Sequence, residues 1–264
     1  MKKLNFLFSR SKQEQDKPIR DKLKTRKDFE RVLAEDLDIM ETTKARMDTA
    51  KNINLYMYRS LSYSYILILQ SKYSVDAKID ELRDIYIKSM HYFLQAFNKR
   101  NPIYADILNY VSLGVLLNIP DNNFRQLIDY VKQMDKQAKP SGWTPDLLLW
   151  FMLNSRMKEQ EKQKYAETLA YPRLYNGLYK VIQAPNAAAA KDALNKYLDR
   201  WYNLNSNAPW YNSHLKDNSY RGYWAWEVAA VAKIMHIDDS DLKNNQYYPY
   251  DMVHWENNET TAKE

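Results

Sequence analysis

Apolar residues recur at helical spacing along most of this chain. Between positions 29 and 54 they fall three or four residues apart and would line one side of a helix, at Phe29, Val32, Leu33, Leu37, Met40 and Met47. No segment of alternating β-branched residues is long enough to build a sheet. The pattern predicts an all-α protein of antiparallel helical hairpins, in two loosely distinct halves that form one compact body.

Capping and breaking residues divide the chain into helices. The segment 54–72 is rich in Tyr, Leu and Ile and is expected to be a more buried helix. Asp76, Asp121 or Asn122, and Asn186 are expected to cap helices. The full set of expected helices covers residues 29–54, 54–72, 79–97, 102–115, 122–134, 145–153, 160–169, 172–182, 187–201 and 221–235.

The best candidate boundary is Lys139-Pro140-Ser141-Gly142, because Pro and Gly together interrupt both helix and strand. It predicts an N-terminal helical module over residues 28–139 and a C-terminal module over residues 140–264. A leader over residues 1–27 precedes them. A length of 264 residues is enough for one large domain or two small ones.

Charge is distributed unevenly along the chain. Residues 1–31 hold 11 Lys and Arg against 5 Asp and Glu, which accounts for the whole net charge of +6. From Asp238 to Glu264 there are seven acids and two lysines. We expect the basic leader, residues 1–27, to be a mobile, solvated tail. A nucleic-acid-binding arm is the alternative interpretation of the same stretch.

No segment has the pattern of a membrane anchor or of a complete signal peptide. The apolar part of the N-terminus ends at Phe8, short of the roughly 7–15 residues that a signal peptide requires. No later run approaches the ~18 uninterrupted apolar residues of a membrane span. We expect a soluble cytoplasmic protein.

The chain offers little for catalysis or for metal binding. With only 4 Gly, no phosphate-binding glycine loop can be assembled, and the lack of Cys excludes thiol chemistry and disulfides. The four His do not have the spacing of a zinc site. No nucleophile elbow is present. We expect no enzymatic activity, no cofactor and no metal.

The most specific stretch runs from Tyr220 to Lys233 and reads Tyr-Arg-Gly-Tyr-Trp-Ala-Trp-Glu-Val-Ala-Ala-Val-Ala-Lys. We expect it to be a helical structural motif, with Glu227 half-buried and held by a tyrosine hydroxyl, an indole N–H or an arginine. The alternative is that Glu227 acts as a general acid or base. The residues of this motif are Gly222, Tyr223, Trp224, Trp226 and Glu227.

An acidic turn at Asp238-Asp239-Ser240 and the cluster Tyr247-Tyr248-Pro249-Tyr250-Asp251 follow the motif. Together with Leu198–Tyr202 and Trp210–His214, these elements resemble the C-terminal module of the PoNi immunity proteins. The N-terminal half resembles the first module of that family more weakly, through residues 69–75 and 79–82. There the chain has Val75-Asp76-Ala77 where the family usually has small residues or Gly.

The resemblance implies an all-α immunity protein that binds one PoNe-type DNase toxin tightly, one to one, in the cytoplasm of the producing or kin cell. Such pairs serve interbacterial competition, including type VI secretion. An acidic surface suits a nuclease's DNA-binding groove, because carboxylates mimic phosphates. The tyrosine cluster suits either a lid over the core or an interface anchor. The predicted toxin-binding residues are Asp238, Asp239, Asp241, Tyr247, Tyr248, Tyr250, Asp251 and Glu256.

Overall fold

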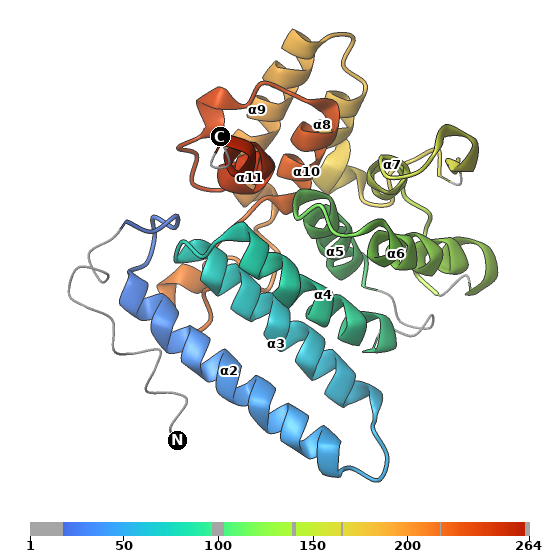
Figure 1. The fold of residues 1–264 in the computed structure, drawn as a ribbon. Helices are drawn as coiled ribbons and strands as arrows, with labels where there is room; N and C mark the ends of the chain where they lie inside the picture. Colours follow the sequence, from blue (N-terminus) through green and yellow to red (C-terminus); the bar gives the residue numbers. More distant parts are fainter. Residues whose placement is uncertain (1–17, 97–102, 139–140, 165, 217, 262–264) are drawn as a thin grey trace.

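The computed structural model describes residues 18–96, 103–138, 141–164, 166–216 and 218–261. Every regular element in these residues is a helix, and the described ranges contain no strand (Figure 1). The all-α prediction is confirmed. Within the same residues, no helix is both long enough and apolar enough to cross a lipid bilayer.

Three long helices form one layer: α2 (Arg26–Thr49), α3 (Leu55–Ser74) and α4 (Ile79–Ala96). They run antiparallel, side by side (Figure 1). Thr25 and Asp28 close a capping box at the start of α2, and the Asn54 side chain accepts the Met57 N–H at the start of α3. The hairpins expected from the sequence are present.

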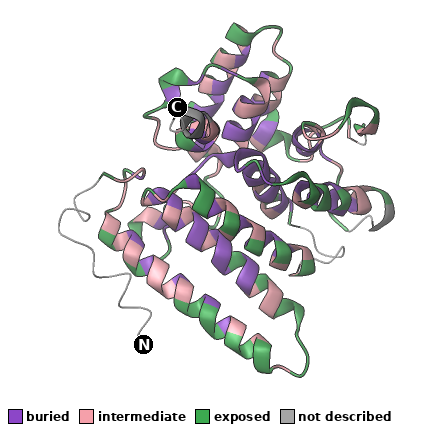
Figure 2. Ribbon diagram, viewed as in Figure 1, coloured by how far each residue is buried: buried purple, intermediate pink, exposed green. Residues whose placement is uncertain are grey.

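The middle of the molecule is built by α5 (Tyr104–Leu116), α6 (Asp121–Gln133) and α7 (Leu147–Asn154), with a π-helical turn at Met134–Ala138. Helix α5 is apolar around almost its whole circumference, and ten of its residues are buried. Such a helix has to be covered on all sides. It packs against α4, α7 and α10, and Figure 2 shows buried residues gathered around it.

The C-terminal part contains α8 (Pro172–Ile182), α9 (Ala187–Leu204), α10 (Trp226–Met235) and α11 (Tyr250–Thr261). Pro172 starts α8 and the Asn186 side chain caps α9, as the sequence predicts. Helices α8 and α9 form a hairpin, and α10 packs on α5 of the N-terminal half. One continuous apolar core extends from Phe29 to Trp255. The two predicted halves therefore share a single core, although part of the expected boundary, residues 139–140, lies outside the described residues.

One expected helix is wrong and another begins later than expected. In the described part of residues 160–169 the regular structure is the end of the 3₁₀ turn Glu159–Glu161, and the backbone bonds to α7 instead: Leu147 N–H donates to the Thr168 carbonyl at 3.0 Å. Residues 221–225 are not helical, and α10 begins at Trp226. The predicted helix positions Phe97 and Pro102 lie outside the described residues.

Asp76 does not cap α4, which begins three residues later at Ile79. Its backbone is left-handed, with φ of 89°, and its carboxylate pairs with Arg20 at 3.2 Å. A left-handed residue at this point ends the preceding helix rather than starting the next.

The leader does not extend to residue 27. Arg20 donates to the Tyr73 carbonyl at 3.0 Å and to the Ala77 carbonyl at 2.9 Å, and Asp21 is buried. The Asp21 carboxylate accepts a hydrogen bond from the Tyr220 hydroxyl. Residues 18–27 are thus part of the folded body, and the prediction of a mobile leader was wrong for them. The remainder of the predicted leader, residues 1–17, lies outside the described residues.

Candidate protein-binding site

The motif segment Tyr220–Ala225 has no regular secondary structure and is held between the N-terminal helix layer and the C-terminal helices. Trp224 and Trp226 both meet Tyr73 of α3 edge-on, at ring-centroid distances of 4.8 and 5.2 Å. The Ala225 N–H donates to the Tyr247 carbonyl at 2.8 Å. The segment therefore fastens the two halves of the chain to each other through aromatic contacts and backbone bonds.

Ser74, the last residue of α3, is the hydrogen-bonding centre of this junction. The Trp224 indole donates to its hydroxyl at 3.0 Å, and that hydroxyl donates to the Arg221 carbonyl at 2.9 Å. Gly222 lies against it with φ of +108°. A Cβ at Gly222 would come within 2.3 Å of Ser74 Oγ and of Trp224 Nε1. Only glycine fits this position, both in backbone conformation and in space.

A buried ion pair joins the same segment to α2. Arg221 binds the Asp36 carboxylate with two hydrogen bonds, Nε to Oδ2 at 2.5 Å and Nη2 to Oδ1 at 2.8 Å. Their side chains are only 8% and 3% exposed. A two-pronged arginine–carboxylate bond satisfies both charges in one geometry, so the position of the motif segment on α2 is fixed.

Tyr223 and its neighbours make a second aromatic group. Its ring lies 5.1 Å from that of Tyr202 and 5.4 Å from that of Trp210. Its hydroxyl accepts the His214 N–H at 3.0 Å. Tyr223, like Trp224 and Trp226, is buried, and these rings face other parts of the same chain.

Glu227, at the start of α10, accepts the Trp201 indole N–H at 2.6 Å. An indole donor was among the partners expected. Burial raises the pKa of this carboxyl to about 7, and the Trp201 bond opposes the shift. The tyrosines Tyr104, Tyr175 and Tyr197 surround it within electrostatic range.

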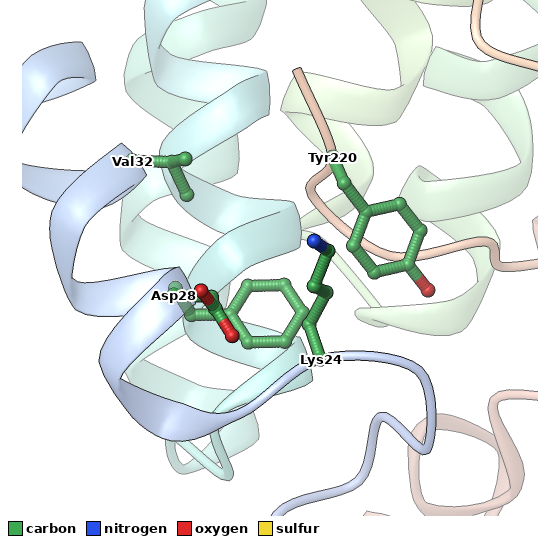
Figure 3. A pocket seen from close by; sticks show the side chains of 5 residues that line it. Lys24, Asp28, Val32 and Tyr220 are labelled. Atoms are coloured by element: carbon green, nitrogen blue, oxygen red, sulfur yellow. The ribbon is translucent and has the colours of Figure 1, made fainter. Parts of the chain in front are cut away.

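Glu227 does not line the hollow found in the described residues, which has an empty volume of about 170 Å³ that includes open solvent. It is lined by Lys24, Asp28, Phe29, Val32 and Tyr220 (Figure 3). In the same residues, no group of three or more His, Cys, Asp or Glu is placed to hold a metal ion. Burial in the packed interior therefore accounts for the raised pKa of Glu227.

The fold buries one acid of the predicted acidic turn and leaves the others exposed. Asp239 is 2% exposed, and its carboxylate accepts the Tyr248 hydroxyl at 2.6 Å and lies 2.7 Å from His254 Nε2. It cannot contact a partner without leaving the core, so its place among the toxin-binding residues is corrected. Its position follows from Ile237 and Leu242, which are buried on either side of the turn.

Asp238 and Asp241 are exposed but already paired. Lys191 of α9 lies 2.8 Å from the first carboxylate and 3.1 Å from the second. The Lys191 bond, followed by one from Ser240, holds the pKa of Asp238 well below its usual value. Bonds from Asn195 and then from Lys191 lower the pKa of Asp241.

The tyrosine cluster acts mainly as a cover for the core. Tyr248 is 2% exposed and is corrected in the same way as Asp239, since its hydroxyl is used internally. Tyr247 is partly buried and stacks on Tyr202, with 5.3 Å between ring centroids. Tyr250 is also partly buried, 4.3 Å from the His254 ring. The lid interpretation of this cluster agrees with these positions.

Asp251 and Glu256 lie on α11 and face cations of this chain. Asp251 is 2.7 Å from Arg20 Nε, and Glu256 is 3.0 Å from Lys233 Nζ and accepts a bond from Asn118. The predicted acids outside the core therefore form two groups: Asp238 and Asp241 share Lys191, whereas Asp251 and Glu256 on α11 pair with Arg20 and Lys233.

Comparison with known proteins decides the family. No curated protein matches the chain. Two family models do: PoNe immunity protein (PoNi), N-terminal, over residues 11–129, and PoNe immunity proteins (PoNi), C-terminal, over residues 144–252. The chain belongs to the PoNi family. Its members are PoNe immunity proteins, so this PoNi chain has an immunity role. The N-terminal match, expected to be the weaker one, spans as long a stretch as the C-terminal match.

The PoNi fold is also found in a solved structure. The crystal structure of protein PA2201 from Pseudomonas aeruginosa superposes with a TM-score of 0.68 at 18% sequence identity, covering 96% of this chain and 93% of that one. At such identity the likeness establishes the fold. It confirms one helical body across nearly the whole PoNi chain.

The sequence analysis missed one surface of this PoNi protein. Helix α3 was expected to be buried, and ten of its residues are. Yet Tyr56 and Tyr63 are 85% and 63% exposed. The signal was available, because Tyr56, Arg59 and Tyr63 follow the i, i+3, i+7 spacing of one helix face.

Proposed function

We propose that this chain neutralises a PoNe-type DNase toxin by binding its nuclease domain directly, one to one, in the cytoplasm of the cell that carries it. The observation that supports this most is that both halves of the chain match PoNe immunity protein models. Neutralisation by binding requires no chemistry from the chain itself. A well-organised interface of about 1,600 Å² is sufficient for nanomolar affinity or better.

The architecture is suited to this role. The aromatic residues of the motif segment pack between the two halves of the chain and hold them together. A surface held on such a body changes little on binding, and a preordered surface loses little entropy. On this account the protein binds its toxin as a rigid body.

The members of the predicted C-terminal set that are not buried, Asp238, Asp241, Tyr247, Tyr250, Asp251 and Glu256, remain a proposed contact region. Each acid there interacts with a cation of the chain. Replacing Asp238 and Asp241 with Lys would therefore put three lysines, including Lys191, close together and would destabilise the fold as well as change the surface. For this reason the loss of toxin binding has to be compared with the change in thermal stability of the same variant.

Co-expression tests the proposed function. The PoNe-type toxin encoded beside this chain is induced in a sensitive host with and without the chain, and viable counts are measured. We expect full rescue with the wild-type chain and none with empty vector. A catalytically inactive toxin gives the baseline for growth. Killing that continues while the folded chain accumulates would refute the proposal.

The second candidate function is nucleic-acid binding through the basic leader, which the charge excess of residues 1–31 supports. Deletion should stop at residue 17, because Arg20 and Asp21 belong to the folded body. If the chain lacking residues 1–17 still neutralises the toxin, the leader is not the functional element. If DNA binding and protection are lost together, this second function replaces the first.

A further inference from the structure

The most exposed aromatic surface of the described chain lies on α3. We call Tyr56, Arg59 and Tyr63 the α3 stripe. Both tyrosine side chains are mostly in solvent, and among the described residues neither has a ring contact or a hydrogen bond. Tyr58 and Tyr65 of the same helix, in contrast, pack on Tyr92.

Helix α2 lies along one side of the stripe. Thr43 Oγ1 lies 3.4 Å from Ser60 Oγ. Ile39 lies one turn from Thr43 on α2 and Tyr63 lies one turn from Ser60 on α3, so in this antiparallel pair the two side chains are on neighbouring turns. The Ile39 side chain is 50% exposed and adds apolar surface to this part of the α2–α3 hairpin.

Helix α5 also reaches α3. The Ser62 hydroxyl of α3 is 2.8 Å from the Tyr110 hydroxyl of α5. Asp106 of the same helix lies within electrostatic range of both Arg59 and Tyr63. A carboxylate of α5 therefore adds negative charge near the stripe.

The neighbouring part of α2 is acidic. Between Val32 and Thr43 it carries four acids and no base: Glu35, Asp36, Asp38 and Glu41. Arg221 pairs with the buried Asp36, whereas Glu41 is 69% exposed and lies 3.5 Å from Lys44. A surface that combines exposed tyrosines with such acids is complementary to a basic partner. DNA-cleaving domains are basic where they bind phosphates.

We propose that the α3 stripe, together with Ile39, is the anchor by which this chain holds the nuclease domain of its toxin. The inference rests on the proposed function and gives that function a contact surface. Tyr and Arg are the residue types most enriched among binding hot spots. Burying Tyr56, Tyr63 and Ile39 would cover on the order of 400 Å², about half of one partner's share in a standard interface.

Self-association fits the same surface less well. In a two-fold dimer the stripe of one copy would face that of the other, and the acids of both α2 helices would be brought together. Like charges placed opposite one another oppose association. A nuclease surface rich in Lys and Arg meets no such repulsion.

The test is a set of matched tyrosine variants of the full chain. Tyr56→Ala, Tyr63→Ala and the double variant are compared with Tyr171→Ala, a 42% exposed tyrosine at the start of α8 that belongs to neither proposed contact surface. Binding to a catalytically inactive form of the PoNe-type nuclease domain encoded beside the chain is measured by calorimetry. Thermal melts check that each variant is folded, which is expected because Tyr56 and Tyr63 are largely solvated.

We expect Kd to rise at least about tenfold for each stripe variant and more than about 100-fold for the double variant. Tyr171→Ala should stay within about threefold of wild type. If the wild-type chain binds and the double variant binds with unchanged affinity, the α3 inference alone is overturned. An equal loss in Tyr171→Ala overturns it as well, as does a dimer that only the stripe variants dissociate. Failure of the wild-type chain to bind overturns the proposed function itself.

Discussion

At the scale of single residues, Gly222 shows how narrowly the family motif is determined. Its φ is +108°, and a Cβ added at this position would lie only 2.3 Å from Ser74 Oγ, so there is no room for a side chain. We expect Gly222→Ala to lower the free energy of unfolding by roughly 2–4 kcal/mol. Gly142→Ala is the matched control, since Gly142 also has positive φ, +76°, but nothing within 4 Å. It should cost only about 1 kcal/mol in a denaturant titration. Equal effects would show that close packing at Gly222 is unimportant.

Glu227 makes stability depend on pH. Its pKa is raised from the ordinary 4.5 to about 7 in the folded protein. The folded state therefore keeps a proton that the unfolded state loses, so this group lowers stability as pH rises from about 4.5 to 7. Glu227→Gln keeps an acceptor for Trp201 without the charge. We expect it to be more stable than wild type by up to about 3 kcal/mol at pH 8 and similar at pH 4.5. Parallel stability–pH curves for the two proteins would contradict this. Full neutralisation of the toxin by the Gln variant would also exclude catalysis through Glu227.

At the scale of elements, the non-helical segment 220–225 joins α2 and α3 to the C-terminal part of the chain through hydrogen bonds and an ion pair. Asp36→Ala leaves the Arg221 charge buried without its partner. The loss should be about 3–5 kcal/mol. Replacing both residues by apolar ones, Asp36→Leu with Arg221→Met, should recover most of it in the same chemical denaturation experiment. If the double variant is as unstable as Asp36→Ala, the ion pair itself is needed for stability and cannot be replaced by apolar side chains.

Helix periodicity predicted most elements from the sequence, and Pro172 and Asn186 marked two starts correctly. It was wrong over residues 160–169 and 221–225, where backbone groups bond to distant segments that local patterns do not reveal. The acidic turn was misjudged for a similar reason. Asp239 is separated from its donors Tyr248 and His254 by many residues, so its burial depends on the tertiary fold.

At the scale of the whole molecule, one apolar core binds two family modules into a single body. Among the described residues its aromatic side chains are mostly internal, and the exposed tyrosines are Tyr56 and Tyr63 of α3 and Tyr171 at the start of α8. Figure 2 shows the outer face and the far end of the α2–α3 hairpin as the more exposed part of the N-terminal layer. A protein of this construction is suited to holding a surface in place, and the surface determines which toxin it recognises.

Stoichiometry tests this account most directly. The full chain is titrated into a fixed amount of the PoNe-type nuclease domain encoded beside it, and cleavage of plasmid DNA is followed. A binding inhibitor should abolish cleavage linearly, with the endpoint at one chain per nuclease. Cleavage that persists at a large excess of the folded chain would contradict the account. So would inactivation of many nuclease molecules by one chain, which would indicate an enzyme.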